Sequence, residues 1–251
     1  MHDHFRVLAL LTISALVVAS NFAIADESDK DLLALARAHF NYDSITSEQE
    51  QRVFDTFFKN VQQGNETNLA PAEGKPTDLT PADQSSSDAR HGDQWGVDRT
   101  IKAKWIVWLC KDPIASKMIP PGGIEISGAK IDGKVDLSWM KIQFQIRASG
   151  CYFKDSVILK WASVRGLKLE HAYIRGSDEK SLDGDGLTVE GDINLFDFDA
   201  EQPVSLRSVT VDGEFASQSA HFYTGALPYN GEINPALDLT SAKIGSGGRL
   251  I

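Results

Sequence analysis

Apolar and small residues recur along the chain with a period of 22, so that residues 124–145 can be laid over residues 146–167. Within each copy the apolar residues come in pairs two positions apart, and successive pairs are about five positions apart. This spacing fits neither the stripe of an amphipathic helix nor the alternation of one long strand. It predicts short strands joined by tight corners. The positions that are identical in the two copies are Ile124/Ile146, Ser127/Ser149, Gly128/Gly150, Val135/Val157, Leu137/Leu159 and Trp139/Trp161.

The spacing of five is clearest over residues 157–176, where the inward pairs are Val157/Leu159, Ala162/Val164, Leu167/Leu169 and Ala172/Ile174. It resembles the pattern of pentapeptide-repeat proteins, in which a small inward residue is followed two positions later by Leu or Phe. Four such pentapeptides form one square coil. The resemblance implies a mainly β fold, a right-handed parallel β-helix solenoid of about five coils, which we place over residues 112–251. The expected coils are residues 124–145, 146–166, 167–203, 204–235 and 236–251.

A second resemblance is carried by two blocks, residues 95–110 (WGVDRTIKAKWIVWLC) and residues 123–137 (GIEISGAKIDGKVDL). They are similar to a bacterial family of predicted membrane-associated, pentapeptide-like proteins that are sometimes labelled oxidoreductases. The similarity extends roughly over residues 92–251 and implies the same solenoid. No motif for a redox cofactor occurs in the sequence, so oxidoreductase activity is not expected.

The N-terminus has the pattern of a secretory signal. Arg6 precedes an apolar run over residues 7–20, and Ala23-Ile24-Ala25 supplies the small residues that a signal peptidase recognises. We therefore predict a signal peptide over residues 1–25 and export to the periplasm or the cell exterior. An uncleaved N-terminal anchor, which would keep the protein membrane-associated, is the alternative.

Helical patterns precede the predicted solenoid. Residues 26–64 are expected to hold a short helix over residues 31–40 and a second one that begins near Thr46 and ends near Gly64. Residues 65–94 are polar and contain three prolines, which predicts a flexible linker and a loosely tethered helical region. Residues 95–111 carry Val97, Ile101, Trp105 and Trp108 at helical spacing, and we expect them to form a helix that caps the first coil.

The charge is uneven along the chain. The net charge is −10, and 42% of the residues are hydrophobic, which is an ordinary globular composition. Basic residues nevertheless concentrate between positions 141 and 175. Equivalent positions in neighbouring coils stack about 4.8 Å apart, which predicts that Trp139 and Trp161 are neighbours beside a basic stripe. The predicted ligand-binding residues are Trp139, Trp161, Arg147, Lys160, Arg165 and Lys168.

Acidic residues concentrate between positions 178 and 201, where Asp183-Gly-Asp185-Gly is similar to part of a calcium-binding loop. Asp183 and Asp185 are therefore candidate calcium ligands, and a solvated acidic loop is the alternative. No other cofactor is expected. The sequence holds no nucleophile elbow, phosphate-binding glycine loop or C-x-x-C motif, so it predicts no catalytic residue.

The two cysteines, Cys110 and Cys151, could pair as a disulfide in an oxidising compartment. Cys151 falls on an inward position of the repeat, which favours a buried free thiol. No cap is visible after the last coil, so its edge could pair with a second copy of the chain.

These observations predict a non-enzymatic envelope protein that binds or scaffolds. Its solenoid wall would face an anionic glycan, a lipid headgroup at a membrane surface, or a protein partner. The signal peptide and the acidic net charge argue against nucleic acid. The alternative is a polysaccharide lyase or hydrolase, with Asp183, Asp185, Asp192 and Arg175 as its site.

Overall fold

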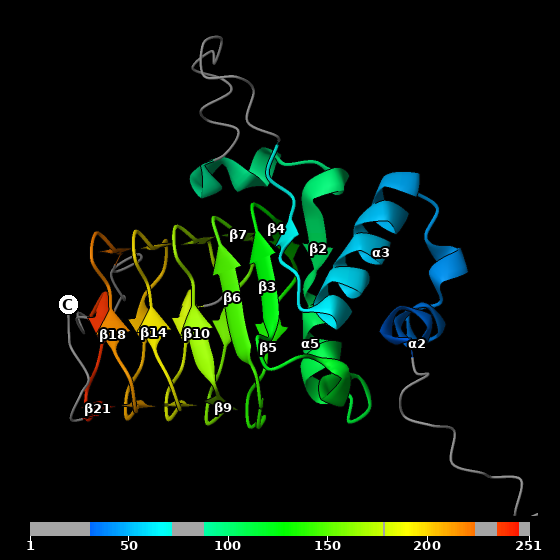
Figure 1. Ribbon diagram of the computed structural model, residues 1–251. Coiled ribbons are helices and arrows are strands. Elements are labelled where there is room, and N and C mark those ends of the chain that lie inside the picture. The colour runs from blue at the N-terminus through cyan, green and yellow to red at the C-terminus, as the bar shows by residue number, and fades with distance from the viewer. Residues whose placement is uncertain (1–30, 72–87, 178, 224–234, 246–251) are drawn as a thin grey trace, which may run out of the picture.

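The computed structural model describes residues 31–71, 88–177, 179–223 and 235–245. These residues form a parallel β-solenoid with helices at one end (Figure 1). None of the helices in the described ranges is long and apolar enough to cross a membrane. The predicted signal peptide, residues 1–25, lies outside the described residues.

The solenoid has four faces, each a parallel sheet in which neighbouring strands come from successive turns of the chain. Face 1 contains β1 (Thr67–Asn68), β3 (Ile124–Ser127), β6 (Gln145–Ser149), β10 (Gly166–Lys168), β14 (Ile193–Asn194) and β18 (Phe215–Ala216). Face 2 contains β2 (Thr100–Lys102), β4 (Lys130–Asp132), β7 (Tyr152–Phe153), β11 (Tyr173–Ile174), β15 (Asp199–Ala200) and β19 (His221–Phe222). Face 3 contains β5 (Val135–Asp136), β8 (Val157–Ile158), β12 (Leu182–Asp183), β16 (Val204–Ser205) and β20 (Leu237–Asp238). Face 4 contains β9 (Ser163–Val164), β13 (Thr188–Val189), β17 (Thr210–Val211) and β21 (Lys243–Ile244).

The solenoid makes about four turns, close to the five coils expected. The first coil has strands on three faces and only an isolated bridge, from Lys141 to Ser163, on the fourth. The register of the 22-residue repeat is confirmed. Ile124 pairs with Ile146, and Val135 pairs with Val157.

The expected boundaries of the later coils are wrong. The sequence predicts one coil over residues 167–203, but β14 already begins the next coil at Ile193. Glu179, Glu190, Asp192 and Asp197 of this stretch are exposed, while Leu187, Val189 and Ile193 between them are fully buried. The acidic stretch therefore belongs largely to the solenoid wall and not to a long inserted loop.

The solenoid interior is apolar and continuous from the first coil to Phe215. Cys110 and Cys151 are both free and buried. Burial raises the pKa of each thiol to about 12. In the last coil, Leu237 and Ile244 are only partly buried, and among the described residues no strand pairs with the outer edges of β18 to β21. Association of this edge with a second copy stays a prediction.

The N-terminal helices cap the first coil (Figure 1). These are α2 (Leu32–His39) and α3 (Glu48–Gln63), and the Ser47 side chain caps α3 by accepting from the Glu50 N–H. The apolar stripe of α3 packs on α5 (Ala103–Lys111), where the Phe54 and Trp105 ring centroids are 5.0 Å apart. The expected loose tethering is therefore wrong, because these aromatic side chains share one core with the solenoid.

The expected capping helix over residues 95–111 begins only at Ala103. Residues before it form a 3₁₀ turn, η5 (Val97–Arg99), and the strand β2, which continues face 2 by pairing with β4. Both ends of the expected linker are also ordered. Residues 67–68 extend face 1 as β1, and η4 (Ala89–Gln94) lies on face 2. The middle of that linker, residues 72–87, lies outside the described residues.

Candidate functional site

Two opposite corners of the solenoid are built from residues in the left-handed backbone conformation. At the corner between faces 1 and 2 these residues are Gly128, Gly150, His171, Asp197 and Ser219. At the corner between faces 3 and 4 they are Trp139, Trp161, Gly186, Ser208 and Ser241. This conformation suits glycine and costs other residues roughly 1–2 kcal/mol. The non-glycine side chains at the two corners are thus candidate functional residues.

The two corner tryptophans form the predicted pair. Trp139 is 74% exposed and Trp161 is 55% exposed, and their stacked rings have centroids 5.8 Å apart and an interplanar angle of 17°. The ring of Trp161 also lies against Gly186, where a Cβ atom would overlap it. Trp161 is therefore held between Trp139 and Gly186, and the free ring face belongs to Trp139.

Stability alone does not explain this pair. An aromatic pair contributes about 0.5–1.5 kcal/mol beyond its buried area. Two left-handed tryptophans cost roughly 2–4 kcal/mol together. The chain therefore holds two large apolar side chains in water at positions where glycine or serine serves in other coils.

The basic residues predicted to flank the tryptophans do not form one wall. Lys160 lies on face 3 beside Trp161, where its Nζ is 2.9 Å from Asp183 Oδ2. Arg147 and Lys168 are neighbours on face 1, and Arg147 Nε is 3.1 Å from Glu170 Oε2. Arg165 follows β9 and turns into face 1. Only residues one full coil apart stack on each other, whereas residues five to eight apart belong to different faces.

The candidate calcium ligands Asp183 and Asp185 face basic side chains. Lys160 and Lys180 contact Asp183 at 2.9 and 3.1 Å, and Arg207 forms an ion pair with Asp185. Partial burial acts to raise the pKa of Asp185, but hydrogen bonds from Arg207 and Ser205 hold that pKa well below its ordinary value. Across the described ranges, no group of three His, Cys, Asp or Glu side chains is placed to hold a metal.

The remaining residues of the predicted lyase or hydrolase site lie elsewhere. Arg175 is on face 2, where its Nε is 3.9 Å from Glu201 Oε2. Asp192 is at the turn before β14 and accepts a hydrogen bond from the Glu214 N–H at 2.9 Å. These residues do not converge with Asp183 and Asp185 on one site.

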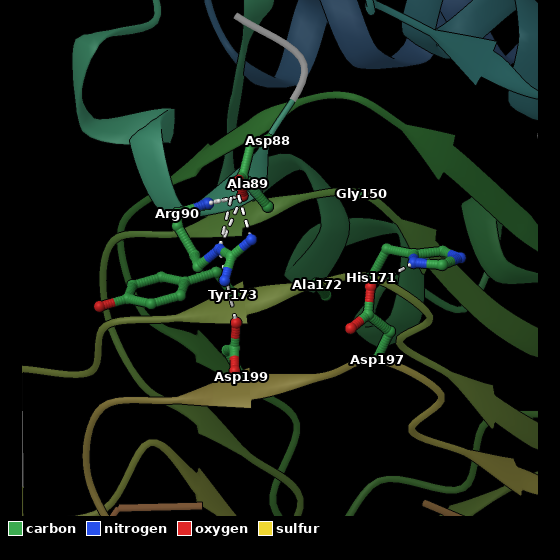
Figure 2. A pocket seen from close by; sticks show the side chains of 9 residues that line it. All are labelled: Asp88, Ala89, Arg90, Gly150, His171, Ala172, Tyr173, Asp197 and Asp199. Carbon is green, nitrogen blue, oxygen red and sulfur yellow. Dashed lines mark hydrogen bonds and ion pairs between the residues drawn. The ribbon is translucent and has the colours of Figure 1, made fainter. Parts of the chain in front are cut away.

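A pocket of about 360 Å³ opens at the other corner, between faces 1 and 2 (Figure 2). One wall is the start of η4, and the floor is the corner with strands β11 and β15. Gly150 leaves this part of the corner open, since a Cβ atom there would meet no other atom within 4 Å. The residues that line the pocket are Asp88, Ala89, Arg90, Gly150, His171, Ala172, Tyr173, Asp197 and Asp199.

The polar side chains of the pocket are paired. His171 Nδ1 lies 2.9 Å from Asp197 Oδ2, and both side chains are half-exposed. Asp199 is only 9% exposed. Its Oδ1 lies 3.0 Å from His221 Nδ1, and its Oδ2 faces the pocket, 3.8 Å from Arg90 Nε. Arg90 also pairs with Asp88 at 2.9 Å.

The carboxylates of this pocket have different environments. Burial raises the pKa of Asp199, although His221 and Arg90 act against that rise. Burial also acts to raise the pKa of Asp88, but hydrogen bonds from Arg90 bring it below its ordinary value.

Tyr173 has a structural role at the edge of the pocket. Its ring stacks on Tyr152 with centroids 5.8 Å apart, and its hydroxyl donates to Glu201 Oε2 at 3.1 Å. Burial and the nearby Glu201 raise the pKa of Tyr173 to about 12. Gly92 of η4 lies on Tyr152 so closely that a Cβ atom would overlap that ring. Packing between η4 and the two tyrosines therefore fixes the pocket wall.

Comparison with protein-family models, with curated proteins and with solved structures gives no match.

Proposed function

We propose that this protein is a binding solenoid whose Trp139/Trp161 corner takes a ring of a neutral glycan. The observation that carries the proposal is the exposure of both indoles at positions where the backbone conformation disfavours them. Backbone strain of this kind clusters at active sites and at positions that contact a ligand. The partner we favour is an envelope polysaccharide, because the N-terminal pattern predicts export.

An exposed indole ring can stack on the ring of a sugar. One face of a pyranose ring presents mostly C–H groups, which pack on an indole as other apolar surface does. The free face of Trp139 would receive this ring, and Trp161 would hold Trp139 in place from behind. Hydroxyl groups at the rim of the sugar would meet Ser138 and Lys160, which lie next to the two tryptophans in the chain.

Charge favours a neutral glycan over the anionic one expected from sequence. Lys160 is paired with Asp183, and Arg207 is paired with Asp185. An anionic polymer would have to compete with these carboxylates for the cations. The basic residues on face 1 lie on a different side of the coil from the tryptophan corner.

The proposal is tested by retention of the full chain on insoluble chitin, cellulose and peptidoglycan. We expect retention on at least one of them, with at least tenfold weaker binding for Trp139→Ala. Tyr223→Ala is the matched control, because Tyr223 is as exposed as Trp161 but lies beyond β19 on face 2. Equal retention of wild type and Trp139→Ala, or retention that is lost only with Lys160→Glu, would rule out the stacking site.

A further inference from the structure

The pocket between η4 and the corner of faces 1 and 2 holds two carboxyl groups in contrasting environments. Asp197 and Asp199 are two positions apart and both line the pocket (Figure 2). Asp199 is nearly buried and turns Oδ2 toward the pocket. Asp197 is half-exposed, and its Oδ2 lies 2.9 Å from His171 Nδ1. Two carboxyl groups that differ in this way can serve as the acid and the base of one reaction.

The charge of the pocket selects the kind of reaction. Three carboxyl groups and one guanidinium line it, which leaves a net charge of −1 when Asp199 is protonated and His171 is neutral. A negative pocket opposes reactions that build up negative charge, such as ester hydrolysis through an oxyanion, and it repels uronates. It stabilises a transition state that develops positive charge, as the oxocarbenium-like transition state of glycoside hydrolysis does.

We propose that this pocket hydrolyses a glycosidic bond of a neutral sugar, with Asp199 as the general acid and Asp197 as the general base. Asp199 Oδ2 gives its proton to the glycosidic oxygen as the bond from that oxygen to the anomeric carbon breaks. Asp197 takes a proton from a water molecule whose oxygen forms the new bond to the same carbon. One water is consumed, and a proton returns from Asp197 to Asp199 through solvent, so atoms and charge balance.

The surroundings of the two groups support these roles. Burial raises the pKa of Asp199, which is the direction that a general acid requires. The hydrogen bond from His171 holds one oxygen of Asp197 and leaves the other to accept from water. The volume of about 360 Å³ lies within the range of small-molecule sites, roughly 300–1,000 Å³. This site lies at the corner opposite the tryptophan pair, so the inference does not depend on the proposed glycan platform.

The test is hydrolysis by the full chain of neutral oligosaccharides and of 2,4-dinitrophenyl glycosides of glucose, galactose, mannose, xylose and N-acetylglucosamine. Loss of a general acid or base typically costs about 10²–10⁴-fold in rate. We expect Asp199→Asn to lose this factor on oligosaccharides and to stay within several-fold of wild type on the dinitrophenyl glycosides. Their leaving group departs without a proton, so this difference between substrates marks a general acid.

Asp197→Asn is expected to lose activity on both kinds of substrate, and azide should restore turnover of Asp197→Ala with a glycosyl azide as product. Asp212→Asn, an exposed carboxylate after β17, is the control and should match wild type. The proposal is overturned if wild-type protein turns over none of the substrates faster than the Asp197→Asn variant does. An equal loss for Asp199→Asn on both kinds of substrate also overturns it. If Asp199→Asn does not fold, Asp197→Asn and the azide product still decide, because Asp197 is half-exposed.

Discussion

Replacing Trp139 with asparagine separates a role in binding from a role in stability. Trp139 has a φ of 64° and is 74% exposed, so little buried area is lost with its side chain. Asparagine is one of the few residues that tolerates this backbone conformation. The substitution therefore relieves backbone strain while it removes the indole.

The two effects are of similar size. The lost ring contact with Trp161 is worth about 0.5–1.5 kcal/mol, and the relieved strain is worth roughly 1 kcal/mol. We expect the free energy of unfolding of Trp139→Asn to stay within about 1 kcal/mol of wild type, whereas glycan retention falls at least tenfold.

Urea denaturation, monitored by circular dichroism, measures the free energy of unfolding. Binding is measured as retention on the insoluble glycan. Trp105→Ala is the contrasting variant, because Trp105 is almost fully buried against the N-terminal helices and should cost about 3–5 kcal/mol. A loss of 2 kcal/mol or more for Trp139→Asn with unchanged retention would refute the reasoning. The tryptophan pair would then be a clamp that stabilises the corner.

Further predictions concern the coil interior and the paired carboxylates. Phe215→Ala should lower the free energy of unfolding by about 3–5 kcal/mol in urea, because this ring is fully buried in the last coil. Gly186→Ala should cost at least about 1 kcal/mol and change the fluorescence of Trp161, since φ is 71° and the new Cβ atom would overlap that ring. Cys151, with its pKa raised to about 12, should stay unmodified by a thiol reagent at pH 8 and react at the rate of unfolding. Asp185→Asn should cost about 1–3 kcal/mol at pH 7. Because the folded pKa of Asp185 is lowered, that difference should vanish as the pH falls through and below the ordinary carboxyl range, as urea melts across pH would show.

The sequence was enough to predict the local parts of the fold. The register of the first two coils followed from identical side chains at equivalent positions, such as Val135 and Val157, and face 3 pairs these two residues. The stacking of Trp139 on Trp161 followed from the same register. The helix that begins after Ser47 followed from its cap and its apolar stripe.

The face on which each side chain lies was harder to predict, because it depends on where the chain turns at the corners. A basic stripe looks continuous in sequence, but the chain turns after each short strand, so Lys160 and Lys168 face different sides. The pocket escaped sequence reasoning because it needed the register of the third and fourth coils. With that register, His171 and Asp197 take the corner positions that Gly128 and Gly150 hold in earlier coils. The replacement of corner glycines by a histidine and an aspartate was the signal in the sequence.

The docking of η4 depends on contacts between residues far apart in the sequence. Gly92 packs on Tyr152, and Lys130 Nζ donates to the Asp93 carbonyl oxygen at 2.8 Å. The polar, proline-containing composition of residues 65–94 predicts a linker, and no local sequence pattern predicts such a contact. Tertiary packing therefore decides the structure of this segment.

The most direct test of the binding account follows the indole N–H signals by NMR while a neutral oligosaccharide, such as a chitin or cellulose fragment, is added to the full chain. The account predicts that the Trp139 and Trp161 signals shift together and saturably, while the buried Trp105 and Trp108 signals stay in place. Shifts confined to other residues, or none up to millimolar sugar, would contradict it.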